Sequence, residues 1–313
     1  MNLFLENLIS ASTQVGMLYV MVAAGFICDK TGLFSEETAK KVVRLLLYFI
    51  TPCTLVNAFS NIENTPENIK KFAVSFLIAT ATHVIAILVN TPFYRNKNDE
   101  TGCIYKFASI YGNVSFMALP LAQAILGDEG TFYCANGVLV FNVVNFAHGA
   151  ILMGRGDEKK INLKNLLMNP GVVSFVIGLP IFLLGIKLPY IVSEPLRMMA
   201  GLNSPIAMLI FGTYLAHTDL KSMFTDKNIY RTAFMKLLVV PLLCLGIYYL
   251  CGVTGVLLTA SIITASAPSA NNTFMLATRY ERDTSVASKT VALVSFISVL
   301  TIPVMIALTQ LTW

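Results

Sequence analysis

The strongest constraint on the fold of this chain is a succession of apolar runs, each about as long as a bilayer is thick. A bilayer core of about 30 Å requires about 20 predominantly apolar residues per helix. Of the 313 residues, 56% are hydrophobic and only 12% are charged, against about 25% charged in a typical soluble domain. The sequence therefore predicts an all-α integral membrane protein that lies in the lipid bilayer and has little mass outside it.

Ten apolar runs are bounded by charged and turn residues, and each predicts one transmembrane helix. No Lys or Arg precedes the first run, so the N-terminus lacks the basic region of a cleavable signal peptide and we expect the first helix to be retained. The ten predicted helices cover residues 12–28, 43–60, 72–92, 104–126, 131–154, 169–186, 202–217, 232–251, 254–278 and 286–309.

Basic residues are distributed unevenly among the predicted loops. Loops rich in Lys and Arg stay on the cytoplasmic side of a membrane. The distribution therefore predicts a multi-pass protein of the plasma membrane with both termini outside, and it agrees with the count of ten helices. All but four of the 22 Lys and Arg residues follow an odd-numbered helix; the exceptions are Lys70, Lys71, Lys187 and Arg197.

Ten helices divide into two halves of five. The predicted halves are residues 1–154 and 169–313, joined by a polar cytoplasmic linker at 155–168. An odd number of helices per half forces the halves into opposite orientations, as in the inverted repeats of many secondary transporters. The segments NVSFM (113–117) and NNTFM (271–275) agree at every position but the second if Ser and Thr are counted as alike, and each lies in the fourth helix of its half.

Pro120 and Pro268 interrupt the pattern of these two helices, because a proline removes a backbone hydrogen bond and crowds the preceding turn. In lipid, the freed backbone groups need partners, so irregular backbone is expected where it lines a cavity or is packed in protein. Helix N-termini at such breaks carry partial positive charge and favour a carboxylate. Packing between helices is the alternative explanation for small polar residues. The polar residues beside the two prolines are Asn113, Ser115, Ser266, Ser269, Asn271, Asn272 and Thr273.

Three segments carry a family resemblance: GNVSFMALPLAQAILGDEG (112–130), APSANNTFMLATRYERDTSVASKTVALVSFISVLTIPV (267–304) and, more weakly, TPCTLVNAF (51–59). They resemble the auxin efflux carrier family, which includes plant auxin exporters and bacterial malate and malonate permeases, and the resemblance extends over nearly the whole chain. The long cytoplasmic loop of the plant exporters has no counterpart in this sequence.

The resemblance implies a fold related to that of bile acid sodium symporters. Two inverted five-helix repeats would bring the broken helices four and nine across each other near mid-membrane. A core panel of helices would move against a scaffold panel in an elevator-type alternating access mechanism, and a homodimer is compatible with the family. Substrate contacts would come from the crossover, here matching Asn113, Pro120, Pro268, Asn271 and Asn272.

Other polar residues extend this candidate site. Ser115 and Ser269 lie beside the two broken segments, and we include them among the substrate-binding candidates. Asn57 in the second predicted helix and Asn142 in the fifth are further candidates, although hydrogen bonds that bridge neighbouring helices would explain these two equally well.

The three histidines and Lys236 need separate interpretation, because they lie in or at the ends of predicted helices. His83 is the clearest ionisable residue within a helix, which makes it a functional candidate, but we expect a neutral imidazole bonded to a backbone carbonyl. His148 and His217 lie at helix ends, where we expect a solvated position. For Lys236 we expect an ammonium that reaches the cytoplasmic surface rather than the substrate.

The sequence excludes several classes of function. It contains no HExxH, GxSxG or P-loop motif, so hydrolytic and ATP-driven chemistry of these types lacks its residues. The six Cys residues are scattered, with no spacing typical of a zinc site. We therefore expect no enzyme, catalytic residue, metal site, cofactor or nucleic-acid partner.

The interpretation that remains is a secondary active or facilitative transporter of a small organic anion, a mono- or dicarboxylate that could be auxin-like. No Asp or Glu lies in the middle of a predicted helix, so a buried carboxylate relay for protons is missing. Sodium can bind neutral oxygens, and the coupling ion, Na⁺ or H⁺, stays open. The alternative is a membrane receptor or sensor that keeps the transporter fold and binds its ligand without moving it; a channel is a third, less favoured possibility.

Overall fold

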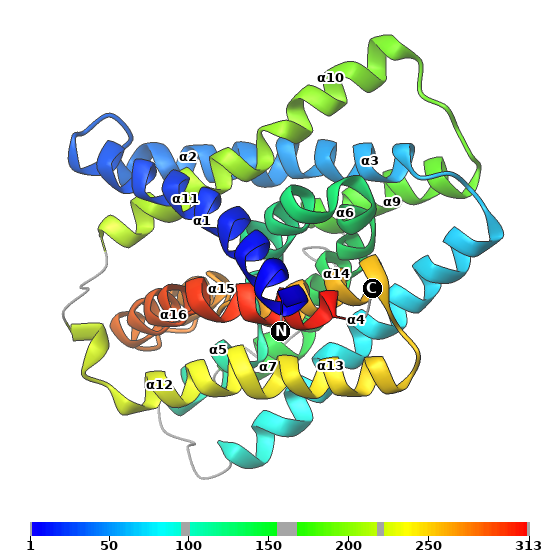
Figure 1. Ribbon diagram of the computed structural model, residues 1–313. Coiled ribbons are helices and arrows are strands. Elements are labelled where there is room, and N and C mark those ends of the chain that lie inside the picture. The colour runs from blue at the N-terminus through cyan, green and yellow to red at the C-terminus, as the bar shows by residue number, and fades with distance from the viewer. Residues whose placement is uncertain (1, 95–100, 155–167, 218–221, 312–313) are drawn as a thin grey trace.

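The computed structural model describes residues 2–94, 101–154, 168–217 and 222–311, and within these ranges the chain is helical apart from turns and one β-bridge (Figure 1). The predicted linker at 155–168 lies outside the described residues except for its last position. The first helices are α1 (Asn2–Lys30), α2 (Glu36–Leu45), α3 (Thr51–Asn61), α4 (Pro66–Phe93), α5 (Gly102–Ile110), α6 (Leu119–Val144) and α7 (Ala150–Met153).

The C-terminal part of the chain begins with α9, and π-helical turns occur in both parts. The later helices are α9 (Pro170–Leu183), α10 (Tyr190–Gly201), α11 (Asn203–Ala216), α12 (Lys227–Phe234), α13 (Val240–Leu250), α14 (Gly255–Ser266), α15 (Asn272–Arg279) and α16 (Thr284–Gln310). The π-helical turns are η1 (Leu46–Ile50), η2 (Val114–Ala118), η3 (Asn145–Gly149) and η6 (Met235–Val239), and η5 (Ser222–Phe224) is a 3₁₀ turn.

Among the described residues, seven helical segments are long and apolar enough to cross a membrane, which confirms the prediction of a multi-pass, all-α membrane protein. Large apolar side chains cover the outer surface; Leu250 is 86% exposed and Ile191 81%. Such exposure suits lipid and not water. The seven segments are Phe4–Lys30, Glu36–Asn61, Pro66–Phe93, Val114–Met153, Tyr190–Ala216, Lys227–Leu250 and Thr284–Gln310.

The longest of these segments turns at Gly127. A straight helix over its 40 residues would be about 60 Å long, twice the thickness of a bilayer core. Gly127 has φ +63° and ψ −148°, a backbone conformation that is essentially restricted to glycine. The chain therefore ends one helix before Gly127 and begins another after it, at the position where the sequence predicted the loop between helices four and five.

Three π-helical turns directly precede a proline. They are η1 before Pro52, η2 before Pro120 and η6 before Pro241. A proline ring collides with the carbonyl group four residues earlier and has no N–H to donate. A π-turn widens the helix at that point, and each proline then lies in the first turn of the next helix, where its missing N–H costs nothing.

The helices pack in two groups (Figure 1). In the first group, α1 packs on α11 and α3 packs on α9 and α10. In the second group, α4 and α14 pack on α6, α13 packs on α14, and α16 packs on α12, α14 and α15. The groups meet where α1 crosses α16 and where α6 contacts α3, α9 and α11.

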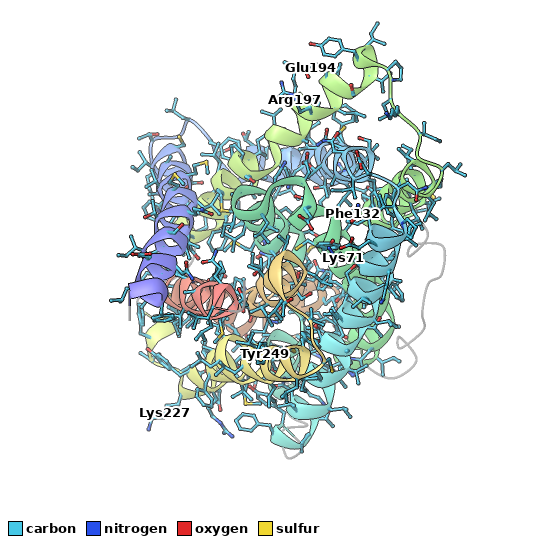
Figure 2. All side chains as sticks on the ribbon, turned by 45° about the vertical axis from the view of Figure 1, so that its right-hand side comes forward. Lys71, Phe132, Glu194, Arg197, Lys227 and Tyr249 are labelled. Atoms are coloured by element: carbon cyan, nitrogen blue, oxygen red, sulfur yellow. The ribbon has the colours of Figure 1, made fainter. Side chains whose placement is uncertain are left out.

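Five phenylalanines fill one of the places where the groups meet. Figure 2 shows Phe132 inside the bundle and the charged side chains of Glu194, Arg197 and Lys227 at its margins. The ring of Phe132 lies 4.7 to 5.4 Å, centroid to centroid, from three others, which come from α3, α4 and α9. Aromatic pairs at such separations add about 0.5–1.5 kcal/mol beyond burial. The cluster consists of Phe59, Phe72, Phe132, Phe175 and Phe182.

Candidate functional site

Two interruptions of the helices meet inside the second group. The chain leaves the helical conformation after α5 and again after α14, and Gly112 forms an antiparallel β-bridge with Ser269. The Asn113 N–H donates to the Pro268 carbonyl oxygen at 2.6 Å, and the Ala270 N–H donates to the Tyr111 carbonyl oxygen at 2.9 Å. Main-chain groups that lipid would leave unsatisfied therefore satisfy one another. We call residues 111–113 and 267–271 the junction.

Ser269 and Asn113 lie within the junction, as the sequence predicted. Ser269 is completely buried and its hydroxyl donates to the Ala108 carbonyl oxygen at 2.8 Å, which ties the second interruption to α5. The side-chain oxygen of Asn113 accepts the Phe116 N–H at 3.3 Å and thereby caps η2. The Asn113 amide nitrogen is buried and has no hydrogen-bond partner among the described residues. Ser115 is half-buried on η2, immediately beyond the junction.

Pro268 lies within an interruption of the helices, whereas Pro120 lies within a helix. Pro268 lies in the second interruption and its carbonyl oxygen is used by Asn113. Pro120 lies outside the first interruption, which is at 111–113, and occupies the first turn of α6. There its carbonyl oxygen accepts the Ser204 hydroxyl at 3.1 Å, a contact to α11. The prediction that the helix breaks at Pro120 was therefore wrong about the position. The break lies at residues 111–113, and the π-helical turn η2 accommodates the proline.

The second interruption ends at the N-terminus of α15. Asn271 is the residue before α15 and makes no side-chain capping bond; it and Asn272 are half-buried. The hydroxyls of Ser266 and Thr273 are buried and have no hydrogen-bond partner among the described residues. Polar atoms without protein partners therefore gather on both sides of the junction.

The side chains of Asn57 and Asn142 form hydrogen bonds outside the junction. The Asn57 amide donates to Asp128 at 3.4 Å, next to the Gly127 turn. The Asn142 amide donates to the Val138 carbonyl oxygen at 2.8 Å, one turn back in its own helix. Neither has a described hydrogen bond to the junction, and their role as substrate contacts stays a prediction.

The histidines differ in their surroundings. His83 is buried and its Nδ1 lies 2.9 Å from the Ala79 carbonyl oxygen, which confirms the expected backbone bond. His217 is exposed and lies 2.8 Å from Asp29. His148 is not simply solvated: it is half-buried, with Nδ1 2.7 Å from the Tyr111 hydroxyl. Tyr111 itself lies in the junction, so His148 connects to the junction through it.

Lys236 is buried, and the prediction that it reaches the surface was wrong. Its side chain is only 3% exposed, and its ammonium donates to the Ala265 carbonyl oxygen at 3.3 Å. A Cβ atom built on Gly112 would lie 3.0 Å from the same nitrogen, so the ammonium lies against the junction. The helix begins at Lys227, five residues before the predicted start at 232, so Lys236 lies nine residues, about 14 Å, along it.

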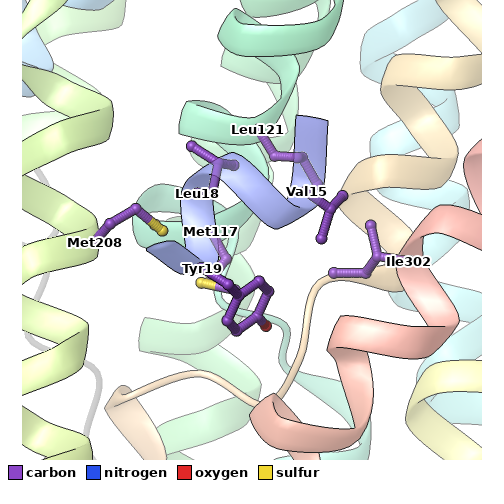
Figure 3. A pocket seen from close by; sticks show the side chains of 7 residues that line it. All are labelled: Val15, Leu18, Tyr19, Met117, Leu121, Met208 and Ile302. Atoms are coloured by element: carbon purple, nitrogen blue, oxygen red, sulfur yellow. The ribbon is translucent and has the colours of Figure 1, made fainter. Parts of the chain in front are cut away.

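The space between the two helix groups beside η2 is almost closed. A cavity there, whose lining side chains are drawn in Figure 3, has a volume of about 10 Å³, roughly enough for one water molecule. Its one polar lining group is the Tyr19 hydroxyl, which bonds Ser295 and Ser298. A dicarboxylate needs far more room, so access to the junction from this side requires the groups to separate. The lining residues are Val15, Leu18, Tyr19, Met117, Leu121, Met208 and Ile302.

Comparison with known proteins identifies the family. The profile described as membrane transport protein matches residues 10–306, nearly the whole chain. The chain belongs to the membrane transport protein family. This confirms the family resemblance seen in residues 112–130 and 267–304, and the family is one of transporters rather than enzymes.

Relatives of this membrane transport protein are distant but extend over most of its length. An uncharacterized transporter of Methanocaldococcus jannaschii is 25% identical over 91% of this chain and 94% of its own. The uncharacterized transporter YfdV of Escherichia coli is 23% identical over 94% of this chain and 96% of its own. A Rhizobium meliloti protein named "Putative malonate transporter" is 25% identical over 67% of this chain and 68% of its own.

Proposed function

We propose that this membrane transport protein is a secondary transporter, active or facilitative, for a small organic anion, a mono- or dicarboxylate. The observation that carries the proposal is the junction, where two interrupted helices bond to each other through the Gly112–Ser269 bridge. Interrupted helices at mid-membrane are the substrate sites of many secondary transporters.

Helix polarity favours an anion at the junction. η2 begins directly after Asn113 and α15 directly after Asn271, so two helix N-terminal ends, which carry partial positive charge, start there. Such ends bind carboxylates without an ionised side chain. The proposed contacts are Asn113, Ser115, Pro268, Ser269, Asn271 and Asn272. The name of the Rhizobium meliloti relative, which refers to malonate, suggests dicarboxylates as the first class to test.

An architecture of ten transmembrane helices in two inverted repeats is part of the proposal. The Gly127 turn divides one of the seven long segments, and the shorter helix α9 and the interrupted pair α14 and α15 complete ten. Helix packing supports this arrangement. Counted among the ten helices, α1 is the first and packs on α11, the seventh, whereas α3 is the second and packs on α9, the sixth. If the two halves are exchanged, the first–seventh pair becomes the sixth–second pair.

We further propose that the second helix group moves against the first, in an elevator-type movement that opens the closed space beside η2. The cavity of about 10 Å³ supports this, because beside η2 a carboxylate has no room to enter while both groups stay in place. A plasma-membrane location with both termini outside, a crossover of helices four and nine, and a homodimer complete the proposal.

The experiment is uptake into vesicles that contain the purified protein. Radiolabelled mono- and dicarboxylates, with malonate first and an indole acid included, are offered under separately imposed sodium and proton gradients. We expect saturable uptake of at least one anion, and its response to each gradient identifies the coupling ion. If anions bind but none crosses under any gradient, the protein is a receptor and the proposal is wrong.

A further inference from the structure

Lys236 contributes a buried positive charge that the helix-end argument above does not use. It lies in η6, a π-helical turn within the apolar segment Lys227–Leu250. Single π-turns within α-helices occur frequently at functional sites. The side chain extends from η6 to the junction, where its nitrogen lies near Gly112 and Ala265.

The charge of Lys236 is incompletely compensated. An ammonium has three hydrogens to donate, and one described hydrogen bond uses one of them, at 3.3 Å to the Ala265 carbonyl oxygen. No carboxylate among the described residues lies within ion-pair distance of it. A buried ammonium without an anion is costly, which means that an anion brought to this place would be bound favourably.

The position of Lys236 also changes the balance of helix charges at the junction. Ala265 lies in the last turn of α14, and Gly112 lies two residues beyond the end of α5. These are the C-terminal ends of two helices, where partial negative charge collects. The charge of Lys236 opposes this partial negative charge, which would otherwise disfavour an anion beside the positive N-terminal ends of η2 and α15.

We propose that Lys236 is the fixed cation that makes the junction selective for anions. This inference rests on the proposed function and deepens it, because it names the residue that favours a carboxylate over a neutral molecule of the same shape. Two buried polar groups in or next to the junction have no described partner, the Asn113 amide nitrogen and the Ser266 hydroxyl, and both can donate hydrogen bonds to an anion.

A purely structural role for Lys236 would be to cap the end of α14. Two substitutions separate the roles. Lys236→Gln keeps an N–H donor for the Ala265 carbonyl oxygen and removes the charge, whereas Lys236→Arg keeps the charge. Lys71→Gln is the matched control, because Lys71 lies at the surface in an ion pair with Glu67 at 2.7 Å.

The test is the concentration dependence of radiolabelled malonate uptake by full-length variants in vesicles, normalised to folded protein. For Lys236→Gln we expect KM to rise about tenfold or more. The maximal rate of that variant, and the KM of Lys236→Arg and Lys71→Gln, should stay within about threefold of wild type. A KM for Lys236→Gln near the wild-type value, or equal increases for the Gln and Arg variants, would overturn the inference.

The wild-type protein provides a second test that does not depend on the variants folding. Malonamide has the shape of malonate without its charges. We expect it to leave malonate uptake unchanged even at about hundredfold excess over the malonate KM, which is a discrimination of more than about 2.8 kcal/mol when converted at 1.4 kcal/mol per factor of ten. Inhibition by malonamide as strong as by unlabelled malonate would overturn the inference. If wild type takes up none of the carboxylates, the proposed function fails first, which is a different result.

Discussion

At the scale of single residues, the two asparagines that precede η2 and α15 differ in what they do for the fold. Asn113 is buried and caps η2 through its side-chain oxygen. Asn271 is half-buried and makes no capping bond. Loss of a capping side chain costs about 0.5–2 kcal/mol of stability, so only Asn113 combines a structural task with its proposed contact to substrate.

Asn271→Ala should therefore weaken transport without weakening the fold. We expect KM for the transported anion to rise about tenfold, the effect of losing one hydrogen bond of about 1.4 kcal/mol, while the amount of folded protein stays near wild type. Uptake assays and size-exclusion profiles of the same preparations measure both. Asn113→Ala is the comparison and should lower the unfolding temperature as well. An equal loss of folded protein in both variants would assign Asn271 to packing.

Sequence alone predicted the junction residues better than the environment of the basic side chains. Asn113, Pro268 and Ser269 were identified because short polar residues and prolines are conspicuous in an apolar helix. Lys236 was placed at the surface because a long side chain can reach water from the end of a helix. Its burial depends on η6 and on the space left by Gly112, and neither is visible in the local sequence.

At the scale of helices, small residues set how closely the first group packs. Gly25 on α1 faces the backbone of α11 at Leu209, and Gly212 on α11 faces the backbone of α1 at Val22; a Cβ atom at either position would overlap the opposing carbonyl oxygen. Gly178 on α9 similarly receives the ring of Phe59 from α3. Close approach through small residues is the usual way in which membrane helices associate, since lipid supplies no hydrophobic drive between them.

Gly25→Ala should destabilise the protein although alanine favours helices. The added methyl group forces α1 and α11 apart, and overpacking of this kind costs about 1–3 kcal/mol. We expect a lower unfolding temperature in detergent, measured by intrinsic fluorescence. Gly16→Ala on the same helix is the control, because its Cβ meets nothing within 4 Å. Equal unfolding temperatures for the two variants would contradict the proposed contact.

At the scale of the whole molecule, the two helix groups share an apolar boundary that is nearly closed beside η2 and holds a groove of about 390 Å³ between α1, α11 and α16. Hydropathy and charge alone predicted a multi-pass helical protein, because the bilayer sets the length of the apolar runs and the side on which basic residues lie, whatever the packing between helices. They could not predict which helices pack together, since apolar surfaces facing lipid and apolar surfaces facing other helices have the same composition. The contacts of α1 with α16 and of α6 with α3, α9 and α11 became visible only in three dimensions.

A cross-link across this boundary should stop transport. Leu18 and Met117 line the closed cavity from α1 and η2 (Figure 3). In a background without the six native cysteines, Leu18→Cys with Met117→Cys, joined by a short cleavable thiol reagent, should reduce uptake by about tenfold or more, and cleavage of the reagent should restore it.

The control pair for that cross-link lies within the first group. Val22 on α1 and Phe211 on α11 line one apolar groove, which α16 also borders through Phe296 and Val299. Cysteines at 22 and 211, joined by the same reagent, should leave uptake near its uncross-linked rate, because both lie on helices of the first group. Full activity of the Leu18–Met117 pair after verified cross-linking would rule out relative movement of the groups at this boundary.

The bonds of the junction have a consequence for how proteins of this kind diversify. Asn113 to Pro268 and Ala270 to Tyr111 are joined only through main-chain atoms, and main-chain atoms are the same in every amino acid that carries an N–H. Side chains at 115, 271 and 272 are thus exchangeable without breaking these bonds, whereas Asn113 also caps η2. Point substitutions at such positions can change which ligand fits while the main-chain frame of the junction is inherited unchanged.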